Sequence, residues 1–357
     1  MREMPAIEKV PASAVAGLIT DALFAVGLPG ADAAKVAEMM LEADLTGADA
    51  HGVFRLPQYV RRLRAGGINP RPAITVTETA AATALIDGDN GMGHLVMARA
   101  AETAITLARK SGIGWVGARR SNHAGSAGVY AALPLAHGMV GIYSVVASTN
   151  HMAMWGGAET LLGTNPLAVA IPAQVEAPVV LDIATTVVSY GTVKAHRLLG
   201  KPMPEGWMVD RSDGAPLTDA ARSAEGLLLP IGGYKGAGLA LVLGLLAGTL
   251  NGAAFGRDVI DFNADDASAC DTGHFIIALD VGRFVPPAEF AAEVDRHVRD
   301  LRASRRLPGV DAIRVPGEER RRRRERRWRD GVPIPPELMA ELDRLADQLG
   351  VKRLRER

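Results

Sequence analysis

The chain of 357 residues has little of what would define a specialised protein class. Cys270 is its one cysteine, so no intrachain disulfide can form, and a secreted, disulfide-stapled scaffold is excluded. The 40 basic and 40 acidic residues cancel, which removes any chain-wide attraction to nucleic acid or to an anionic membrane. The remaining composition, 48% hydrophobic and 22% charged, is typical of a globular protein with two or three substructures.

Long hydrophobic runs are absent as well. The most apolar segment, residues 236–250, holds no charge but is shorter than the roughly 20 residues that a bilayer-spanning helix needs, so it is predicted to be a buried core helix. Residues 1–5 contain an acidic residue and a proline where a signal peptide would have a basic start and an apolar stretch. We therefore expect a cytoplasmic protein with no membrane association.

The hydrophobic periodicity predicts an α/β protein. Two helices are expected between residues 11 and 45, separated at Gly30, followed by a turn at 51–56 and a helix at 57–63. Further helices are predicted at 95–110, 127–136, 186–199, 236–250, 287–303 and 336–349, and strands at 84–86, 115–118, 140–147, 167–171, 179–183 and 275–279. This order divides the chain into an N-terminal helical region (1–75), a mixed α/β core (76–310) and a C-terminal helical segment (311–357).

Residues 112–117 match the dinucleotide fingerprint G-x-G-x-x-G, but their surroundings are wrong. In that motif a strand precedes the glycines, and a helix N-terminus follows to bind the pyrophosphate. Here a predicted helix precedes them and a predicted strand follows, so Gly112 is interpreted as a helix stop and not as part of a Rossmann fold. Residues 232–236 also lack the spacing of a phosphate-binding P-loop and the hydroxyl that would follow Lys235.

Signatures of metal binding and of nucleophilic catalysis are missing too. The chain has neither H-E-x-x-H nor a paired-cysteine spacing, so no metal site is predicted. It has no G-x-S-x-G elbow, and Cys270 lies in a polar stretch without a neighbouring base that could activate it. Other side chains must therefore carry any catalysis.

Two of the eight histidines have neighbours typical of a catalytic site. Imidazole exchanges protons near neutrality because its ordinary pKa is ~6.5. His123 is followed by the small residues 124–128, which leave backbone amides open to an anion or a cofactor phosphate at a helix start. His51 precedes Arg55, whose planar guanidinium suits a carboxylate. These features favour an enzyme with a joint substrate site, in which either histidine could be the proton-transfer group.

Three other features leave a functional and a structural interpretation open. Asp182 could orient an imidazole, contact a ribose hydroxyl or only cap a helix. Lys235, in a glycine-rich turn, could bind a phosphate or simply be exposed. The arginine-rich segment from Arg320 to Arg329 could bind a polyanion, but its interleaved acidic residues favour a solvated, ion-paired helical face. Five further histidines are interpreted as structural: His94, His137, His151, His196 and His274.

Many ordered segments resemble the malate/L-lactate dehydrogenase family, which also holds ureidoglycolate dehydrogenase, sulfolactate dehydrogenase, diketogulonate reductase and piperideine-2-carboxylate reductase. They are ADLTG (43–47), HGVFRLPQY (51–59), SNH (121–123), WGG (155–157), GTNP (163–166), DIAT (182–185), PEGW (204–207), GGYKG (232–236), GHF (273–275) and PGE (316–318). The resemblance spans nearly the whole chain. It implies a non-Rossmann NAD(P)-binding fold of the α/β class with a mixed sheet.

The same resemblance implies an oxidoreductase that uses NAD or NADP and transfers hydride to or from C2 of a small 2-hydroxy/2-oxo acid, malate-like or lactate-like, or of a cyclic imino acid. It makes His123 the proton acceptor, with His51, Arg55 and Tyr59 binding the substrate; His51 and Asp182 are further catalytic candidates. The implied cofactor contacts are His123, Ala124, Gly125, Ser126, Ser148, Asp182, Ile183, Ala184, Lys235, Pro316, Gly317 and Glu318. Such proteins are commonly homodimers.

Three positions depart from the pattern of the family. Ala50 stands where some relatives have a serine that relays protons through the first histidine, so a relay through this position lacks its hydroxyl. Ala124 replaces a frequent phenylalanine, and Met154 replaces a frequent proline. These changes leave the substrate open. The alternative hypothesis is a non-catalytic, polyanion-binding protein on the same scaffold that uses Arg320 to Arg329.

Overall fold

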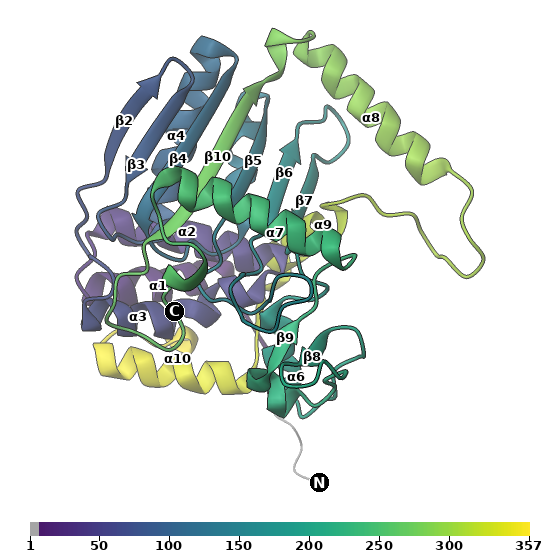
Figure 1. Cartoon of the computed structure of the whole chain (residues 1–357). Coiled ribbons are helices and arrows are strands. Elements are labelled where there is room, and N and C mark those ends of the chain that lie inside the picture. Colours follow the sequence, from purple (N-terminus) through teal and green to yellow (C-terminus); the bar gives the residue numbers. More distant parts are fainter. Residues whose placement is uncertain (1–6) are drawn as a thin grey trace.

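A mixed seven-stranded sheet lies at the centre of the computed structural model, which describes residues 7–357 (Figure 1). Its strands, in spatial order, are β2 (Thr75–Ala80), β3 (Thr83–Asp87), β4 (Ile113–Ser121), β10 (Thr272–Asp280), β5 (Met139–Val145), β6 (Leu167–Ile171) and β7 (Val179–Ile183). Strands β3 and β4 are parallel, and the other neighbouring pairs in this sheet are antiparallel. The predicted α/β class with a mixed sheet is confirmed.

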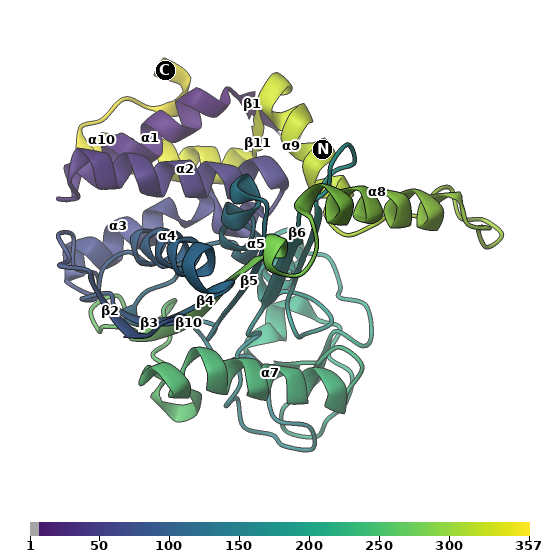
Figure 2. The same cartoon turned by 90° about the horizontal axis from the view of Figure 1, so that it is seen from above.

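Helices cover both faces of the sheet. Helices α4 (Gly93–Ser111) and α5 (Ala127–Ala131) lie on one face, and α7 (Tyr234–Ala247) lies on the other (Figure 2). Helix α4 comes very close to β4, because a Cβ at Gly114 would be only 2.2 Å from the carbonyl oxygen of Ala104. The helix ends at Gly112, whose φ of 84° is in the left-handed region, so the predicted helix stop is confirmed.

The N-terminal and C-terminal segments form one helical layer beside the sheet. It contains α1 (Ala12–Ala25), α2 (Gly30–Thr46), α3 (Leu56–Ala65) and α10 (Pro336–Leu349), which bury their apolar faces in a common core. Strand β1 (Glu8–Val10) pairs with β11 (Val332–Ile334) and joins the two ends of the chain. The division of the chain at residues 75 and 310 stays a prediction.

Three elements lie outside these layers. Helix α6 (Tyr190–Leu198) and the hairpin of β8 (Met208–Asp210) and β9 (Gly226–Leu228) surround a small core of their own. Helix α8 (Pro287–Ala303) projects away from the body (Figures 1 and 2). Helix α9 (Glu318–Asp330) returns to pack against α2. No helix among residues 7–357 has the length and apolar character to cross a membrane.

The apolar segment that was predicted to be a buried helix is buried on one side only. Helix α7 packs Ala240, Leu243 and Ala247 towards the sheet. Its outer side is exposed, with Val242 52% and Leu245 42% accessible. The prediction of a fully buried helix is wrong for the outer side of α7. The sequence of this helix is apolar all round, so it has no polar stripe from which the solvent-facing side could be predicted.

Most other predicted elements are confirmed, and the misses are short. The helix predicted at 127–136 ends as an α-helix at Ala131 and continues as the 3₁₀ turn Leu133–His137, which contains Pro134. The helix predicted from residue 186 begins at Tyr190, where the Ser189 side chain accepts a hydrogen bond from Thr192 N–H. Sequence periodicity missed β2 and four strands of three residues, β1, β8, β9 and β11, which are too short to show alternation.

Candidate active site

One turn positions His51, Arg55 and Tyr59. The 3₁₀ turns Asp49–His51 and Val53–Arg55 lead directly into α3, which has Pro57 in its first turn, as predicted. Arg55, at the N-cap of α3, and Tyr59 are four residues apart and share one side of the helix, whereas His51 precedes Gly52, whose ψ of −141° is not helical.

Asp44, in the last turn of α2, binds the backbone of the segment that carries His51 and Arg55. Its Oδ2 accepts a hydrogen bond of 2.8 Å from Val53 N–H. A Cβ at residue 52 would lie 1.9 Å from Asp44 Oδ1, so a larger residue than Gly52 would displace the Asp44 side chain. The backbone around His51 is therefore packed directly on a buried carboxyl group.

His123 follows β4 and meets His51 across the site. The two imidazole rings stack with centroids 5.3 Å apart and an interplanar angle of 15°. The Tyr59 hydroxyl lies 2.6 Å from Nδ1 of His123, and the Phe262 ring packs with its centroid 5.3 Å from the His123 ring. The structure thus brings together the two histidines that the sequence singled out.

The contacts at Nδ1 restrict what His123 can do. If Nδ1 accepts a hydrogen bond from the Tyr59 hydroxyl, the neutral ring carries its proton on Nε2 and cannot accept another there. If Nδ1 carries the proton and donates it to the Tyr59 oxygen, Nε2 is free to accept a proton, but the Gly125 N–H that lies 3.4 Å from Nδ1 then loses its acceptor. Tyr59 is fully buried and its hydroxyl contacts His123, and its predicted role in substrate binding stays a prediction.

Burial keeps both imidazoles neutral near pH 7. It lowers the pKa of His51 to about 4; the nearby Arg55 cation lowers the pKa further, and Asp182 opposes this effect. Burial, followed by the Arg55 charge, also holds the pKa of His123 well below 6.5. Each ring can therefore act as a proton acceptor, and His51 Nδ1 is buried without a hydrogen-bond partner among the described residues.

Arg55 is a partly buried cation that is held by neutral groups. Its Nε donates to the carbonyl oxygen of Ala50 at 2.9 Å, and Nη1 donates to Gln58 Oε1 at 2.6 Å and to Asn263 Oδ1 at 3.0 Å. Within residues 7–357, no carboxylate lies within 4.0 Å of its guanidinium. Burial lowers the pKa of Arg55 from its ordinary value. The side chain is fixed in place, and its positive charge is free for a ligand.

Asp182 connects the loop after His123 with α9. Its Oδ2 accepts hydrogen bonds from Ser126 Oγ at 3.1 Å, from Gly128 N–H at 3.0 Å and from Arg320 Nη1 at 2.6 Å. Gly128 is in the first turn of α5, where backbone N–H groups lack partners within the helix. Asp182 therefore caps α5 from the neighbouring strand β7, whereas the sequence suggested a cap on the helix that follows it.

Two other predicted cofactor contacts present unpaired polar groups. Ser148 Oγ is buried without a hydrogen-bond partner in the part of the chain that the structure describes. Lys235 is exposed in the first turn of α7, and no described carboxylate lies within 4.0 Å of its ammonium group. Ile183 ends β7, and Ala184 continues the chain beyond it.

The predicted contacts Pro316, Gly317 and Glu318 lie beside β7. The carbonyl oxygen of Pro316 accepts a 3.1 Å hydrogen bond from Val180 N–H, and Gly317 has a φ of 94°. The Glu318 carboxylate is buried and pairs with Arg302 at 2.8 Å. This carboxylate is thus engaged within the protein.

The arginine-rich segment forms α9, and its eight arginines each lie within 4.0 Å of a carboxylate. The predicted ion-paired helical face is confirmed. It is not solvated throughout, because the Arg327 side chain is only 12% exposed.

Sequence reasoning missed several neighbours of the site. Gln58 could have been found, since it follows Arg55 by three residues, in the first turn of the helix that Arg55 precedes. Phe262 and Asn263 come from a distant loop that carried no signal. His94, interpreted as structural, is buried with its ring centroid 5.4 Å from that of Tyr59, and burial lowers its pKa to about 3.

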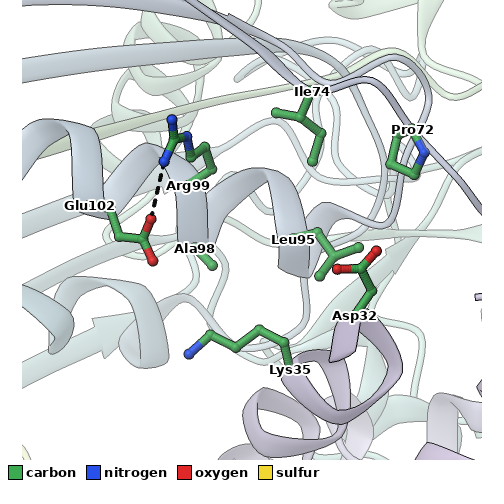
Figure 3. Close-up of a pocket in the computed structure, with 8 residues that line it drawn as sticks. All are labelled: Asp32, Lys35, Pro72, Ile74, Leu95, Ala98, Arg99 and Glu102. Atoms are coloured by element: carbon green, nitrogen blue, oxygen red, sulfur yellow. Dashed lines mark ion pairs between the residues drawn. The ribbon is translucent and has the colours of Figure 1, made fainter. Parts of the chain in front are cut away.

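A surface pocket of about 310 Å³ lies between α2 and α4 (Figure 3). It is lined by Asp32, Lys35, Pro72, Ile74, Leu95, Ala98, Arg99 and Glu102. Its two basic and two acidic side chains balance, and Arg99 pairs with Glu102 at 3.6 Å. None of the predicted site residues lines it.

The malate/L-lactate dehydrogenase family profile matches residues 10–343. The chain belongs to the malate/L-lactate dehydrogenase family. It is 36% identical to the malate dehydrogenase of Pyrococcus horikoshii over 97% of each chain. It is 37% identical to the L-sulfolactate dehydrogenase of Methanocaldococcus jannaschii, covering 94% of this chain and 95% of the relative. It is 32% identical to the NAD(+) ureidoglycolate dehydrogenase of Escherichia coli, covering 90% and 91%.

Solved structures of the malate/L-lactate dehydrogenase family have the same fold. The Pyrococcus horikoshii malate dehydrogenase superposes with a TM-score of 0.89 at 33% identity, covering 99% of this chain and 100% of that one. The Δ1-piperideine-2-carboxylate reductase of Pseudomonas syringae superposes with a TM-score of 0.84 at 28% identity, covering 95% and 100%. The family and the oxidoreductase class that the sequence predicted are confirmed; the roles of individual residues stay predictions.

Asp44 makes the stability of this family member depend on pH. Burial raises the pKa of Asp44 to about 8, whereas an unfolded aspartate titrates near 3.9. The folded state therefore holds a proton that the unfolded state releases, and stability falls as pH rises from about 4 to about 8. We expect Asp44→Asn to remove roughly 4 kcal/mol of this loss, measured as the free energy of unfolding in urea between pH 5 and pH 9.

The control for this effect is Asp21→Asn, an exposed aspartate that pairs with Arg357 at 2.9 Å. It should leave the slope of stability against pH unchanged. An Asp44→Asn protein with the same slope as the wild type would contradict the assignment.

Proposed function

We propose that the protein is an NAD(P)-dependent oxidoreductase that interconverts a small 2-hydroxy acid and its 2-oxo acid, or reduces a cyclic imino acid. The observation that carries this proposal is Arg55, a guanidinium without a carboxylate partner among the described residues, beside the stacked rings of His51 and His123. A substrate carboxylate supplies the missing negative charge. An imidazole then accepts the proton of the hydroxyl group in oxidation, or donates a proton to the keto or imino group in reduction.

The residues around this site fit a nicotinamide dinucleotide. The buried Ser148 hydroxyl lacks a partner among residues 7–357, and Lys235 offers an exposed ammonium group to a phosphate. The proposed cofactor contacts are His123, Ala124, Gly125, Ser126, Ser148, Asp182, Ile183, Ala184, Lys235, Pro316, Gly317 and Glu318. The cofactor, NAD or NADP, supplies or accepts the hydride when bound.

The side chains of the site divide the remaining work. Arg55 binds the substrate carboxylate through its guanidinium, which Gln58 and Asn263 hold in place. His123 accepts the hydroxyl proton in oxidation and returns it in reduction; Nε2 is the accepting atom when Nδ1–H donates to the Tyr59 oxygen in place of accepting from Gly125 N–H. His51 binds the substrate from the adjacent stacked position, and it is the alternative proton acceptor.

The test is a reductase assay. The purified protein is mixed with NADH or NADPH and a panel of 2-oxo acids and cyclic imines, and loss of absorbance of the reduced cofactor is followed. The melting temperature with each cofactor is measured in parallel, because a ligand that binds only the folded state raises it and identifies the preferred nucleotide. No turnover of any panel member together with no thermal shift would overturn the proposal.

We also propose that the protein is a homodimer formed through the outer face of α7. This face carries Tyr234, Val242 and Leu245, which are 64%, 52% and 42% exposed. Contiguous exposed apolar surface on a globular protein marks an interaction site, and a second copy buries the same patch on both partners.

Light scattering of the wild type should give twice the chain mass of 37.6 kDa. Leu245→Lys places a charge in the α7 face and should give the mass of one chain. Phe24→Lys, at an exposed position on α1, is the matched control and should stay dimeric. A wild-type mass of one chain, or dissociation by Phe24→Lys alone, would contradict this interface.

We place the enzyme in the cytoplasm, since its proposed reaction draws on the intracellular pool of nicotinamide cofactor. Cell fractionation that recovered the protein with membranes or outside the cell would contradict this location.

A further inference from the structure

Three arginines of α9 share one face and leave the helix to reach other elements. Arg320, Arg324 and Arg327 are spaced at i, i+4 and i+7, so they form one stripe along the helix. We call them the inner arginines. The remaining five pair with carboxylates of their own segment, at Glu318, Glu319, Glu325 and Asp330. The segment thus has an inner and an outer set of cations.

The last inner arginine holds the turn that carries His51. Arg327 donates to both carboxylate oxygens of Asp49, with Nη2 3.2 Å from Oδ2, and also to the carbonyl oxygen of Asp44. Asp49 comes two residues before His51, and the Asp44 side chain accepts from Val53 N–H two residues after it. Arg327 is therefore bonded to residues on both sides of the interface between α2 and the His51 turn.

The first inner arginine holds the other side of the site. Arg320 donates from Nη1 to Asp182 Oδ2 at 2.6 Å and from Nη2 to the Asp182 carbonyl oxygen at 3.3 Å. The same carboxylate accepts from Ser126 and Gly128 in the loop after His123. Arg320 therefore holds the Asp182 carboxylate in place, and this carboxylate in turn holds the loop after His123.

The middle inner arginine attaches the centre of α9 to α2, between the contacts of Arg320 and Arg327. Arg324 Nε donates to both oxygens of Glu42, at 2.8 Å and 3.0 Å, and so joins α9 to α2. Because the three arginines lie on one rigid helix, a shift of α9 would strain the His51 turn and the His123 loop together. Replacing Arg327 alone should loosen the His51 turn, and replacing Arg320 alone should loosen the His123 loop.

We propose that the inner arginines are positioning residues, through which α9 clamps the two histidine-bearing segments of the site against each other. Arg327 positions the substrate-binding turn and Arg320 positions the cofactor-binding loop; these functional assignments rest on the proposed dehydrogenase function. The outer arginines donate no hydrogen bond to either histidine-bearing segment among the described residues, although Arg323 lies against Gly47 at the end of α2.

Hydrogen–deuterium exchange of the full-length protein without ligand tests the clamp directly. Arg327→Gln should speed exchange about tenfold in residues 48–56 and leave residues 122–130 unchanged. Arg320→Gln should give the reverse pattern. Arg321→Gln is the matched control, since Arg321 pairs with Glu325 on the outer side of the same helix at 2.9 Å, and it should change neither segment.

Kinetics of the same variants test the consequence for binding. Arg327→Gln should raise KM for the 2-oxo acid about tenfold, with Kd for NAD(P)H unchanged, whereas Arg320→Gln should raise Kd for NAD(P)H about tenfold. Arg327→Lys should recover part of the loss. Asp49→Asn leaves the bond from Arg327 to the Asp44 carbonyl oxygen, so it should reproduce only part of the Arg327→Gln effect, and the double variant should add nothing beyond Arg327→Gln.

Exchange and kinetic effects that are equal for Arg320→Gln, Arg327→Gln and Arg321→Gln would overturn the clamp, as would no effect from any of them. The segment-specific exchange pattern in a protein that turns over no acid of the panel would support the clamp and reject the proposed function. A wild type with normal activity would support the proposed function. If its Arg327→Gln variant did not change KM selectively and its Arg320→Gln variant did not change Kd selectively, the clamp would be rejected.

Discussion

Replacing His123 by alanine is expected to lower NAD(P)H-dependent turnover of the 2-oxo acid about 10³-fold, because general acid–base catalysis contributes 10²- to 10⁴-fold. The measurement is kcat under saturating substrate. Cofactor affinity, measured by titration of the reduced-nicotinamide fluorescence, should fall much less, since the neighbouring backbone stays in place.

Comparison with His51→Ala decides which imidazole transfers the proton. His51 stacks on His123 and faces the same site, so its loss should mainly raise KM if it binds the substrate. His137→Ala serves as the control, because this exposed histidine contacts Arg109 away from the two rings. A 10³-fold loss in His51→Ala with near-normal kcat in His123→Ala would reverse the two roles.

Tyr59→Phe separates orientation of His123 from its chemistry. The change removes the hydroxyl 2.6 Å from Nδ1 and keeps the buried ring. We expect a loss in kcat of about tenfold, much smaller than for His123→Ala, because the imidazole remains but loses the Tyr59 oxygen as a partner for Nδ1–H.

Replacing Arg55 by glutamine is the second change with a large expected effect. A substrate carboxylate left without its buried cation loses about 3–4 kcal/mol of interaction, which corresponds to a 10²- to 10³-fold decrease in kcat/KM. The loss should fall mainly on KM, because the same contact exists before and during hydride transfer. Steady-state kinetics over a range of acid concentrations measures it.

Arg55→Lys tests whether charge alone is sufficient. Lysine keeps the positive charge but not the planar fork that Gln58 and Asn263 hold, so an intermediate loss is expected. Arg61→Gln is the control on the helix that follows Arg55, where an exposed guanidinium pairs with Asp266 at 3.1 Å. If Arg55→Gln changed kcat/KM less than threefold, the substrate carboxylate would bind elsewhere.

Local signals in the sequence were sufficient where a structural choice depends on neighbouring residues. Pro57 and Gly112 mark a helix start and a helix stop because each restricts or permits backbone angles at its own position. Strand β7 and helix α8 match their predicted bounds because their apolar spacing and flanking residues agree.

Long-range contacts of the site had no comparable signal. The spacing of Arg320, Arg324 and Arg327 shows that they share a helix face, but it does not show that the face meets Asp182, Glu42 and Asp49. Those partners are distant in sequence, and loop closure brings them close only in the folded chain. For the same reason Asn263 was not predicted beside Arg55.

The order of motifs along the chain was enough to establish the family, the mixed α/β class and the two histidines, because these depend on residue identity and local spacing. Tertiary packing alone decided that the histidine rings stack, that Tyr59 bonds His123, that Asp182 caps α5 and that one side of α7 is left exposed. The physical reason is that burial and electrostatic pairing depend on surfaces that distant segments create together, and no single stretch of sequence contains both sides of such a surface.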